Sequence, residues 1–185
     1  MDGCVSYTNH DDGMVLDALL FATEQHGGQV RRGTDLPYIT HPVAVSYIVA
    51  QFKRSRHLPD LVTAAILHDV LEDTETSFAD LATRFTPLVA SLVQELTSDA
   101  AEIARVGKRE YLKSKMVGMS SYALVIKLAD RLHNISDRPT PKMVADTMDI
   151  LAHIQSARRL TAAQRHLVER ITVACGNAGG YDDRP

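Results

Sequence analysis

Apolar side chains recur every three or four residues along most of this chain, which is the spacing that places them on one face of an α-helix. The segment Met14 to His26 has this spacing, with Asp12 before it as a candidate N-cap and two glycines, Gly27 and Gly28, after it as a stop. No segment keeps a period-two alternation long enough to compete as a β-strand. The pattern therefore predicts helices throughout.

The next two predicted helices bring polar residues to defined places. A helix over residues 42–52 begins at a proline, which suits the first helical position, and has His41 just ahead of it. A helix over residues 61–74 is apolar on nearly every face as far as Leu67, as expected of a buried central helix, and is strongly polar from His68 onwards. A buried helix that ends in titratable side chains is a candidate site.

The rest of the chain continues this helical pattern. Ser77 and Asp80 resemble a capping box, and Gly107 either ends the helix that begins at residue 87 or lies within it. Caps and prolines predict further helices at 77–85, from 87, and at 108–116, 122–135, 142–154 and 162–174, the last ending at Gly176. We expect one all-α domain of eight or nine helices over residues 14–176, between flexible tails at 1–13 and 177–185.

Composition narrows the class of function. The 185 residues carry a formal net charge of −3 and only 5% aromatic residues with no Trp, which argues against nucleic acid and anionic membranes as partners. The two cysteines, Cys4 and Cys175, form no metal-binding or disulfide pattern, and no segment reads as a signal peptide or membrane span, so we expect a soluble cytoplasmic protein. Eight histidines in an acidic chain favour a divalent metal.

The polar end of the helix over residues 61–74 concentrates candidate metal ligands. Helical spacing places His68 beside Glu72, and Asp69 beside Glu72 and Asp73. Three carboxylates on one turn repel each other, and a divalent cation is the simplest compensation. The alternative is that the helix surfaces after Leu67 and ends in a solvated acidic turn.

A second apolar helix presents another acid. Asp130 follows a strongly apolar run, with Lys127 one turn before it and Asn134 one turn after it. Taken alone, this pattern fits an ion pair between Lys127 and Asp130 on a solvated stripe. Together with His41 and the His68–Asp69 pair, it allows a set of four metal ligands from three separate elements.

These residues lie within sequence motifs that resemble those of a known family. The order of His41, His68–Asp69 and Asp130 resembles the HD-superfamily metal-dependent phosphohydrolases, and GGQVRRGTDLPYITHP, AAILHDVLEDT and IKLADRLHN resemble the hydrolase domain of the RelA/SpoT-homologue family. That resemblance implies an HD-domain helical bundle that removes pyrophosphate from the guanosine alarmones (p)ppGpp, giving GDP or GTP. The length of the chain is similar to that of the small, stand-alone alarmone hydrolases.

The resemblance also implies roles for particular residues. The implied Mn²⁺ ligands, for which another divalent metal is an alternative, are His41, His68, Asp69 and Asp130. The implied acidic pair that activates the attacking water is Glu72 and Asp73. The implied substrate contacts are Arg31 or Arg32, Tyr38, Lys127 and Asn134. The segment RRGTDLPY is one residue longer than the usual spacing, which leaves the two arginines as alternatives, and Tyr38 has packing against Pro37 as its plainer interpretation.

Other functions share parts of this pattern. The same site allows (p)ppApp, a deoxynucleotide monophosphate or the 2′-phosphate of NADPH as substrate, or a non-catalytic nucleotide sensor. A di-iron oxygenase needs additional histidine ligands, whereas the other histidines read as surface or structural, namely His26, His57, His133, His153 and His166. The basic segment 108–115 fits a solvated face as well as an anion funnel, and Arg131 reads as surface charge. The oligomeric state is left open.

Overall fold

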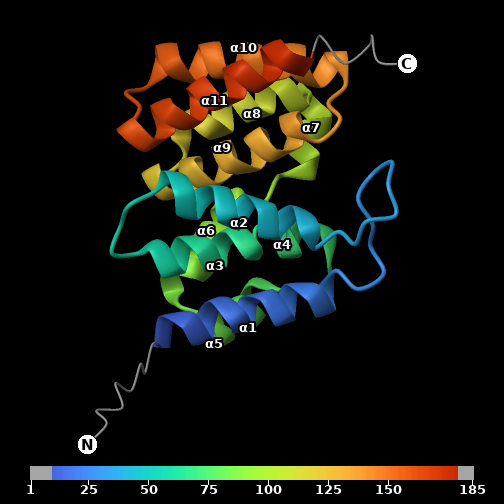
Figure 1. The fold of residues 1–185 in the computed structure, drawn as a ribbon, viewed down its shortest axis with the longest axis vertical. Coiled ribbons are helices and arrows are strands. Elements are labelled where there is room, and N and C mark those ends of the chain that lie inside the picture. Colours follow the sequence, from blue (N-terminus) through green and yellow to red (C-terminus); the bar gives the residue numbers. More distant parts are fainter. Residues whose placement is uncertain (1–9, 179–185) are drawn as a thin grey trace, which may run out of the picture.

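Helices make up the regular secondary structure of the described chain, apart from one isolated β-bridge between Val30 and Pro37. The structure is a computed structural model that describes residues 10–178 (Figure 1). The helices in this range are α1 (His10–Gln25), α2 (Thr40–Phe52), α3 (Leu58–Ile66), α4 (Val70–Asp73), α5 (Phe78–Arg84), α6 (Pro87–Leu96), α7 (Ala100–Val106), α8 (Lys108–Gly118), α9 (Ser121–Ser136), α10 (Pro141–Ala157) and α11 (Ala162–Ala178). The prediction of an all-α fold is confirmed.

Two helices, α3 and α9, form the centre of the bundle. Helix α3 packs against α1, α2, α6 and α9, and α9 packs against α2, α6, α10 and α11 as well as against α3. Residues 123–126 of α9 are all buried, which explains why this segment is apolar on every face. Figure 1 shows α1 and α10 at opposite ends of the molecule, with α2 and α9 between them. Three of the four predicted metal ligands thus lie on α9 or in the turn that directly follows α3.

The helix predicted over residues 61–74 is broken in the structure. Helix α3 ends at Ile66, Leu67 to Asp69 form a turn, and α4 begins at Val70. His68 and Asp69 therefore lie at the junction of two helices, and the helical spacing expected to bring His68 beside Glu72 is wrong. The break redirects the chain where the sequence changes from apolar to polar.

A second predicted segment is also divided. Helix α6 ends at Leu96, and α7 follows as a separate short helix that ends at Gly107. The φ angle of Gly107 is +85°, a left-handed conformation that side chains other than glycine rarely adopt, and α8 begins directly after it. Of the two alternatives for Gly107, the structure therefore shows a helix end. These two divisions raise the number of helices in the described range to eleven.

Most of the predicted helix starts are confirmed at the level of single hydrogen bonds. The Ser77 hydroxyl accepts from the Asp80 backbone N–H at 3.2 Å, and the Asp80 carboxylate accepts from the Ser77 N–H at 2.8 Å, so Asp completes this capping box. Ser120 and Thr140 each accept from the backbone N–H three residues ahead, at 3.2 Å. Thr161 and Gln164 form a further reciprocal cap, at 2.8 and 3.4 Å.

Three helix ends differ from the sequence-based boundaries. Helix α1 begins at His10, so Asp12 lies inside the helix and not ahead of it. Helix α2 begins at Thr40, so His41 lies within the helix and not ahead of it. Helix α11 continues through Gly176 to Ala178, because glycine within a helix costs only about 1 kcal/mol relative to alanine. Residues 1–9 and 179–185, including Cys4, lie outside the described range, and no helix within it is long and apolar enough to cross a bilayer.

Candidate active site

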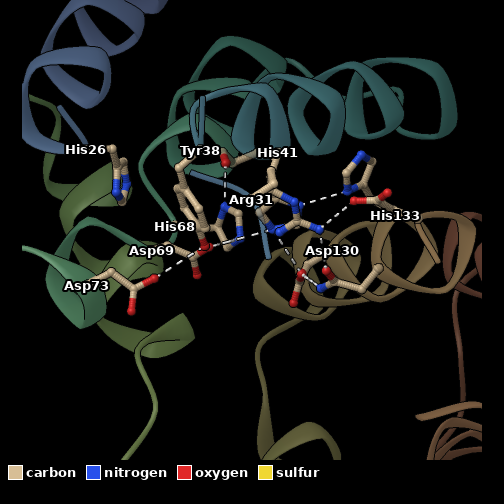
Figure 2. Close-up of polar contacts among 12 residues, drawn as sticks. His26, Arg31, Tyr38, His41, His68, Asp69, Asp73, Asp130 and His133 are labelled. Carbon is tan, nitrogen blue, oxygen red and sulfur yellow. Dashed lines mark hydrogen bonds and ion pairs between the residues drawn. The ribbon is translucent and has the colours of Figure 1, made fainter. Parts of the chain in front are cut away.

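Three elements bring two histidines and two aspartates together. His41 is the second residue of α2, His68 and Asp69 occupy the turn between α3 and α4, and Asp130 belongs to α9. Figure 2 shows their side chains pointing toward one another. One ligand atom from each of His41, His68 and Asp130 lies within 4.8 Å of the others, and all three residues are buried. The fold thus assembles residues that are far apart in the sequence.

His68 has one ring nitrogen fixed by the main chain and the other directed at a carboxylate. Its Nδ1 lies 2.8 Å from the carbonyl oxygen of Ala65, so this nitrogen carries the proton and donates it. Its Nε2 lies 3.0 Å from Oδ2 of Asp69 and, within the described residues, has no hydrogen-bond partner although it is buried. Such a close approach to a carboxylate is satisfied either by a second proton on the ring or by a bound cation.

His41 faces both carboxylates. Its Nε2 lies 3.3 Å from Oδ1 of Asp130 and 3.6 Å from Oδ2 of Asp69. Oδ2 of Asp69 is thus shared by both imidazoles, and Oδ2 of Asp130 pairs with the Lys127 ammonium at 2.9 Å. The predicted pair between Lys127 and Asp130 exists, but it is largely buried instead of lying on a solvated stripe.

The protonation equilibria reflect this crowding of charges. Burial opposes ionisation of Asp130, yet Lys127 and the two imidazoles hold the pKa of this carboxyl well below its usual range. Burial alone would lower the pKa of His68, but the Asp69 carboxylate raises it to about 9. Burial likewise opposes ionisation of Asp69, and His68 lowers the pKa of that carboxyl. The site therefore favours two ionised carboxylates together with positive charge beside them.

This donor set fits a divalent metal ion. Imidazole nitrogen and carboxylate oxygen are the ligands that suit first-row divalent metals, and the orphaned Nε2 of His68 gives a buried donor that such an ion satisfies. His41, His68, Asp69 and Asp130 would hold the ion. The assignment of these four residues as ligands stays a prediction, as do the roles of the other site residues.

The acidic pair on α4 lies beside this cluster, but its two carboxylates are held differently. Oε2 of Glu72 accepts a hydrogen bond from the backbone N–H of Ser98 at 3.0 Å, which turns it toward the start of α7. Oδ2 of Asp73 accepts from the Tyr38 hydroxyl at 3.3 Å. Partial burial and the neighbouring charges of Asp69 and Glu72 raise the pKa of the Asp73 carboxyl. Asp73 is therefore the member of the pair directed at the cluster.

Tyr38 connects the two groups of acids. Its hydroxyl donates to Oδ2 of Asp69 at 2.6 Å as well as approaching Asp73, and its ring lies 4.8 Å from the ring of His26 (Figure 2). Burial and the Asp69 carboxylate raise the pKa of the Tyr38 hydroxyl, so that it stays a donor. The expected packing on Pro37 is therefore not its main contact, because the hydroxyl is committed to the two aspartates.

The loop before α2 places two arginines beside the cluster. The Arg31 guanidinium donates to Oδ1 of Asn134 at 3.2 Å and to Oδ2 of Asp137 at 3.0 Å, and it lies 5.9 Å from the centre of the Tyr38 ring. The Asn134 amide in turn donates to Oδ1 of Asp130 at 2.5 Å. Arg32 is exposed. Arg31 is thus the arginine that is built into the site.

These side chains line one cleft of about 620 Å³. Ten of the eleven predicted site residues line it, and the eleventh, His68, lies buried behind Asp69. The cleft also has basic residues that extend away from the acidic cluster, namely Lys108, Arg109, Arg131 and Lys142. Arg131 was expected to be a surface charge, but it lies in the wall of the cleft. Lys108 and Arg109, at the start of the basic segment 108–115, also line the cleft. Asp146 also lines the cleft and pairs with Arg109 and Lys142, so the lining combines the acidic cluster with basic side chains, two of which have an acidic partner.

Sequence reasoning missed several residues of this site. Nδ1 of His133 lies 2.8 Å from Nδ1 of His41, and Asp137 anchors Arg31, one turn after Asn134. Burial, followed by the charges of His41 and Arg31, lowers the pKa of His133 to about 4. His133 lies three residues after Asp130 on α9, and Asp137 follows the end of that helix three residues after Asn134, so the signal in the sequence was this spacing from predicted site residues.

Comparison with known proteins identifies the family. The family model described as the HD domain matches residues 18–163. The chain belongs to the HD domain family. The matched range contains all eleven predicted site residues and both helices that form the centre of the bundle.

Individual relatives of this HD domain protein carry related names. The Xenopus tropicalis protein named guanosine-3′,5′-bis(diphosphate) 3′-pyrophosphohydrolase MESH1 is 33% identical over 137 residues, which are 71% of this chain and 74% of that protein. A Streptomyces coelicolor GTP pyrophosphokinase is 40% identical over 117 residues, or 62% of this chain, but the chain spans only 13% of that relative. The solved structure of a metazoan orthologue of SpoT, described as hydrolysing ppGpp and having a role in starvation responses, matches with a TM-score of 0.72 at 25% identity, covering 88% of this chain and 96% of that one.

Proposed function

We propose that this protein is a metal-dependent hydrolase that removes pyrophosphate from the 3′ position of guanosine alarmones, (p)ppGpp. The observation that carries the proposal is the convergence of His41, His68 and Asp130 within 4.8 Å, beside a cleft that basic side chains also line. The names of MESH1 and of the metazoan SpoT orthologue, which this chain resembles over most of its length, support the same reaction.

Mn²⁺ is the proposed ion, with His41, His68, Asp69 and Asp130 as its ligands. A bound divalent ion lowers the pKa of water and withdraws charge from phosphoryl oxygens. The protein contributes ligands whose orientation is already fixed, since the main-chain carbonyl of Ala65 holds the ring of His68 and the ammonium of Lys127 holds one oxygen of Asp130. Such fixed ligands avoid reorganisation during the reaction.

The acidic pair supplies the base. In the proposed reaction, water attacks the phosphorus atom bonded to the 3′ oxygen, the bond from that phosphorus to the 3′ oxygen breaks, and the 3′ oxygen gains a proton. Asp73 is directed at the metal-binding cluster and has a raised pKa, so it is the proposed acceptor of the proton from water, with Glu72 as its partner. The products are pyrophosphate and GDP from ppGpp, or GTP from pppGpp.

The rest of the cleft recognises the polyanion. Arg31 is fixed between Asn134 and Asp137 at the edge of the cluster, with its guanidinium facing the Tyr38 ring. A planar guanidinium in this position suits both stacking on a base and pairing with phosphate. The basic side chains farther along the cleft favour a substrate with two separate groups of phosphates over one with a single phosphate.

A nucleotide panel tests the proposed function. The full chain, freed of metal and then supplied with Mn²⁺, is incubated with ppGpp, pppGpp, ppApp, a deoxynucleotide monophosphate and NADPH, and release of pyrophosphate and phosphate is measured. We expect pyrophosphate from the guanosine alarmones, and no product when a chelator is present. The Asp69→Asn variant is the matched control for contaminating phosphatases.

Each other outcome assigns a different function. Faster release from ppApp moves the proposal to adenine alarmones, and release of phosphate from NADPH or the monophosphate alone overturns alarmone hydrolysis. Tight binding of ppGpp without hydrolysis of any nucleotide identifies a sensor. A cytoplasmic location, where these nucleotides occur, belongs to the proposal as well.

A further inference from the structure

One histidine outside the predicted ligand set lies directly behind a ligand. His133 is on α9, three residues after Asp130, and its ring is tilted against that of His41 with the ring centres 4.9 Å apart. The two Nδ1 atoms lie 2.8 Å apart, which is the distance of a good hydrogen bond (Figure 2). His133 therefore contacts the site from the side opposite to the carboxylates.

The number of protons available to the two rings determines which one donates in this hydrogen bond. Two nitrogens joined by one hydrogen bond share one proton, so one Nδ1 donates and the other accepts. Nε2 of His41 faces Asp130 at 3.3 Å and Asp69 at 3.6 Å, and it must keep its lone pair if it is to bind a metal. His41 then carries its proton on Nδ1 and donates it, and Nδ1 of His133 is the acceptor.

His68 also needs an acceptor for the proton on its Nδ1, and there the main chain supplies it. Nδ1 of His68 donates to the backbone carbonyl of Ala65, an acceptor that no substitution removes. The acceptor for His41 is a side chain, and it is held in a half-buried position beside the ion pair of Arg31 with Asp137. The two predicted histidine ligands thus have equivalent support, one from the main chain and one from His133.

We propose that His133 is a positioning residue that holds His41 in the tautomer whose Nε2 is free to bind the divalent ion. This inference rests on the metal site of the proposed function, and it adds a residue that neither the sequence motifs nor the comparisons assign. Partners that orient metal-binding histidines typically change metal affinity or activity by roughly 10- to 100-fold when they are removed.

The experiment measures metal affinity directly. Metal-free protein is titrated with Mn²⁺ by calorimetry for the wild type and for His133→Phe, which keeps a ring but has no acceptor. His133→Asn places an amide oxygen near the position of Nδ1 and tests rescue. His153→Phe is the matched control, because His153 is an exposed histidine on α10 outside the cleft. The melting temperature of each metal-free variant is recorded as well.

The inference predicts a specific pattern. His133→Phe should raise the Kd for Mn²⁺ by roughly 10- to 100-fold, whereas His133→Asn should stay within about threefold of the wild type and His153→Phe should match it. The melting temperature of metal-free His133→Phe should stay close to that of the wild type, because a purely structural role would lower this temperature and leave Mn²⁺ affinity unchanged. If the phenylalanine is too large to fold, His133→Ala takes its place.

Two results would overturn the inference, and neither depends on alarmone hydrolysis. A wild-type Kd in both His133→Phe and His133→Ala excludes a role in metal binding. Equal loss of affinity in the asparagine and phenylalanine variants excludes the acceptor role. If the wild type binds Mn²⁺ but hydrolyses no alarmone, the proposed function fails while these affinity ratios still test His133.

Discussion

Nε2 of His68 lies 3.0 Å from Oδ2 of Asp69, although the two residues are neighbours in the chain and the other ring nitrogen already donates to the carbonyl of Ala65. A continuous helix directs consecutive side chains about 100° apart, so this approach depends on the break between α3 and α4. The break lets one apolar helix end in two adjacent predicted ligands that face the same point. Asp130 and His41 then complete the cluster from α9 and α2.

The first prediction separates metal binding from turnover. Asp69→Asn removes the carboxylate that faces both imidazoles, so we expect it to lose both bound Mn²⁺ and hydrolysis. Asp73→Asn changes the proposed acceptor of the proton from water, outside the ligand cluster, so it should retain Mn²⁺ and lose turnover by roughly 10²- to 10⁴-fold. Metal content by elemental analysis, measured beside the rate of pyrophosphate release, distinguishes the two. A metal-loaded, active Asp69→Asn protein contradicts the ligand assignment.

A second prediction concerns the Tyr38 hydroxyl, which donates to Asp69 at 2.6 Å and to Asp73 at 3.3 Å. Hydrogen bonds to charged groups contribute about 1.5–3 kcal/mol, so Tyr38→Phe should lower kcat by roughly 10- to 100-fold. The ring remains, so KM for ppGpp should change by less than about threefold. Steady-state kinetics of Tyr38→Phe beside Tyr38→Ala check this. If the ring alone lines the nucleotide pocket, Tyr38→Phe behaves as the wild type and only Tyr38→Ala raises KM.

The sequence predicts where the helices of this fold begin better than it predicts where they break or what holds their ends. Capping residues such as Ser77, Ser120 and Thr140 act within one helical turn, so their positions in the sequence are sufficient to place helix starts. The break after Ile66 has no glycine or proline to announce it, and the helix that ends there packs against four other helices that the local sequence does not reveal. The C-terminal end of α8 is held by Arg158, which donates to three of its carbonyl oxygens from 39 to 42 residues away, and no local pattern reveals such a contact.

The site shows the same division. Residues that belong to the same short sequence motif, such as His68 and Asp69, can be paired from the sequence alone. The contact of His41 with His133 joins residues 92 positions apart, and that of Arg31 with Asp137 joins residues 106 positions apart, so both require the fold. The net charge of −3 also gave no indication of the charge in the cleft, because it sums an acidic cluster and basic side chains that line the same cleft.

A third prediction concerns stability and pH. Asp17 on α1 and Arg84 on α5 form a two-pronged ion pair at 2.6 and 2.8 Å, and the hydrogen bond from Arg84 lowers the pKa of the Asp17 carboxyl. The pKa is lower in the folded state, so this stabilisation is present above the unfolded pKa near 4 and is lost as pH falls further. Both side chains are more than a third exposed, so Asp17→Asn should lower the free energy of unfolding by only about 0.5 kcal/mol at pH 7.

Urea unfolding at several pH values checks this third prediction. The difference between wild type and Asp17→Asn should shrink progressively as pH falls below about 4 and the carboxyl becomes protonated. Added salt at pH 7 should also reduce it. Asp35→Asn is the control, because Asp35 is exposed and forms no ion pair within the described residues. A difference that stays constant with pH would mean that packing, and not charge, accounts for the effect.

The fourth prediction decides between the two arginines that the sequence leaves as alternatives. Arg31 is held by Asn134 and Asp137 over the Tyr38 ring, whereas Arg32 is exposed at the rim of the same cleft. A guanidinium that is already fixed loses little side-chain entropy on binding, so its contact with the nucleotide is the stronger one. Arg31→Ala should therefore raise KM for ppGpp by roughly 10- to 100-fold, which is about 1.4–2.7 kcal/mol, with a smaller effect on kcat.

Arg32→Ala is the matched control for that measurement, since it removes the same charge from a neighbouring position. It should change KM by less than about threefold, because an exposed side chain contributes mainly a screened charge. Asp137→Asn should fall between the two variants: it leaves Arg31 in place but removes the 3.0 Å ion pair that holds its guanidinium. Steady-state kinetics on all three variants, at one salt concentration, give the comparison. If Arg32→Ala raises KM more than Arg31→Ala does, the nucleotide is held at the rim of the cleft, and the contacts that fix Arg31 serve only to join the loop before α2 to the end of α9.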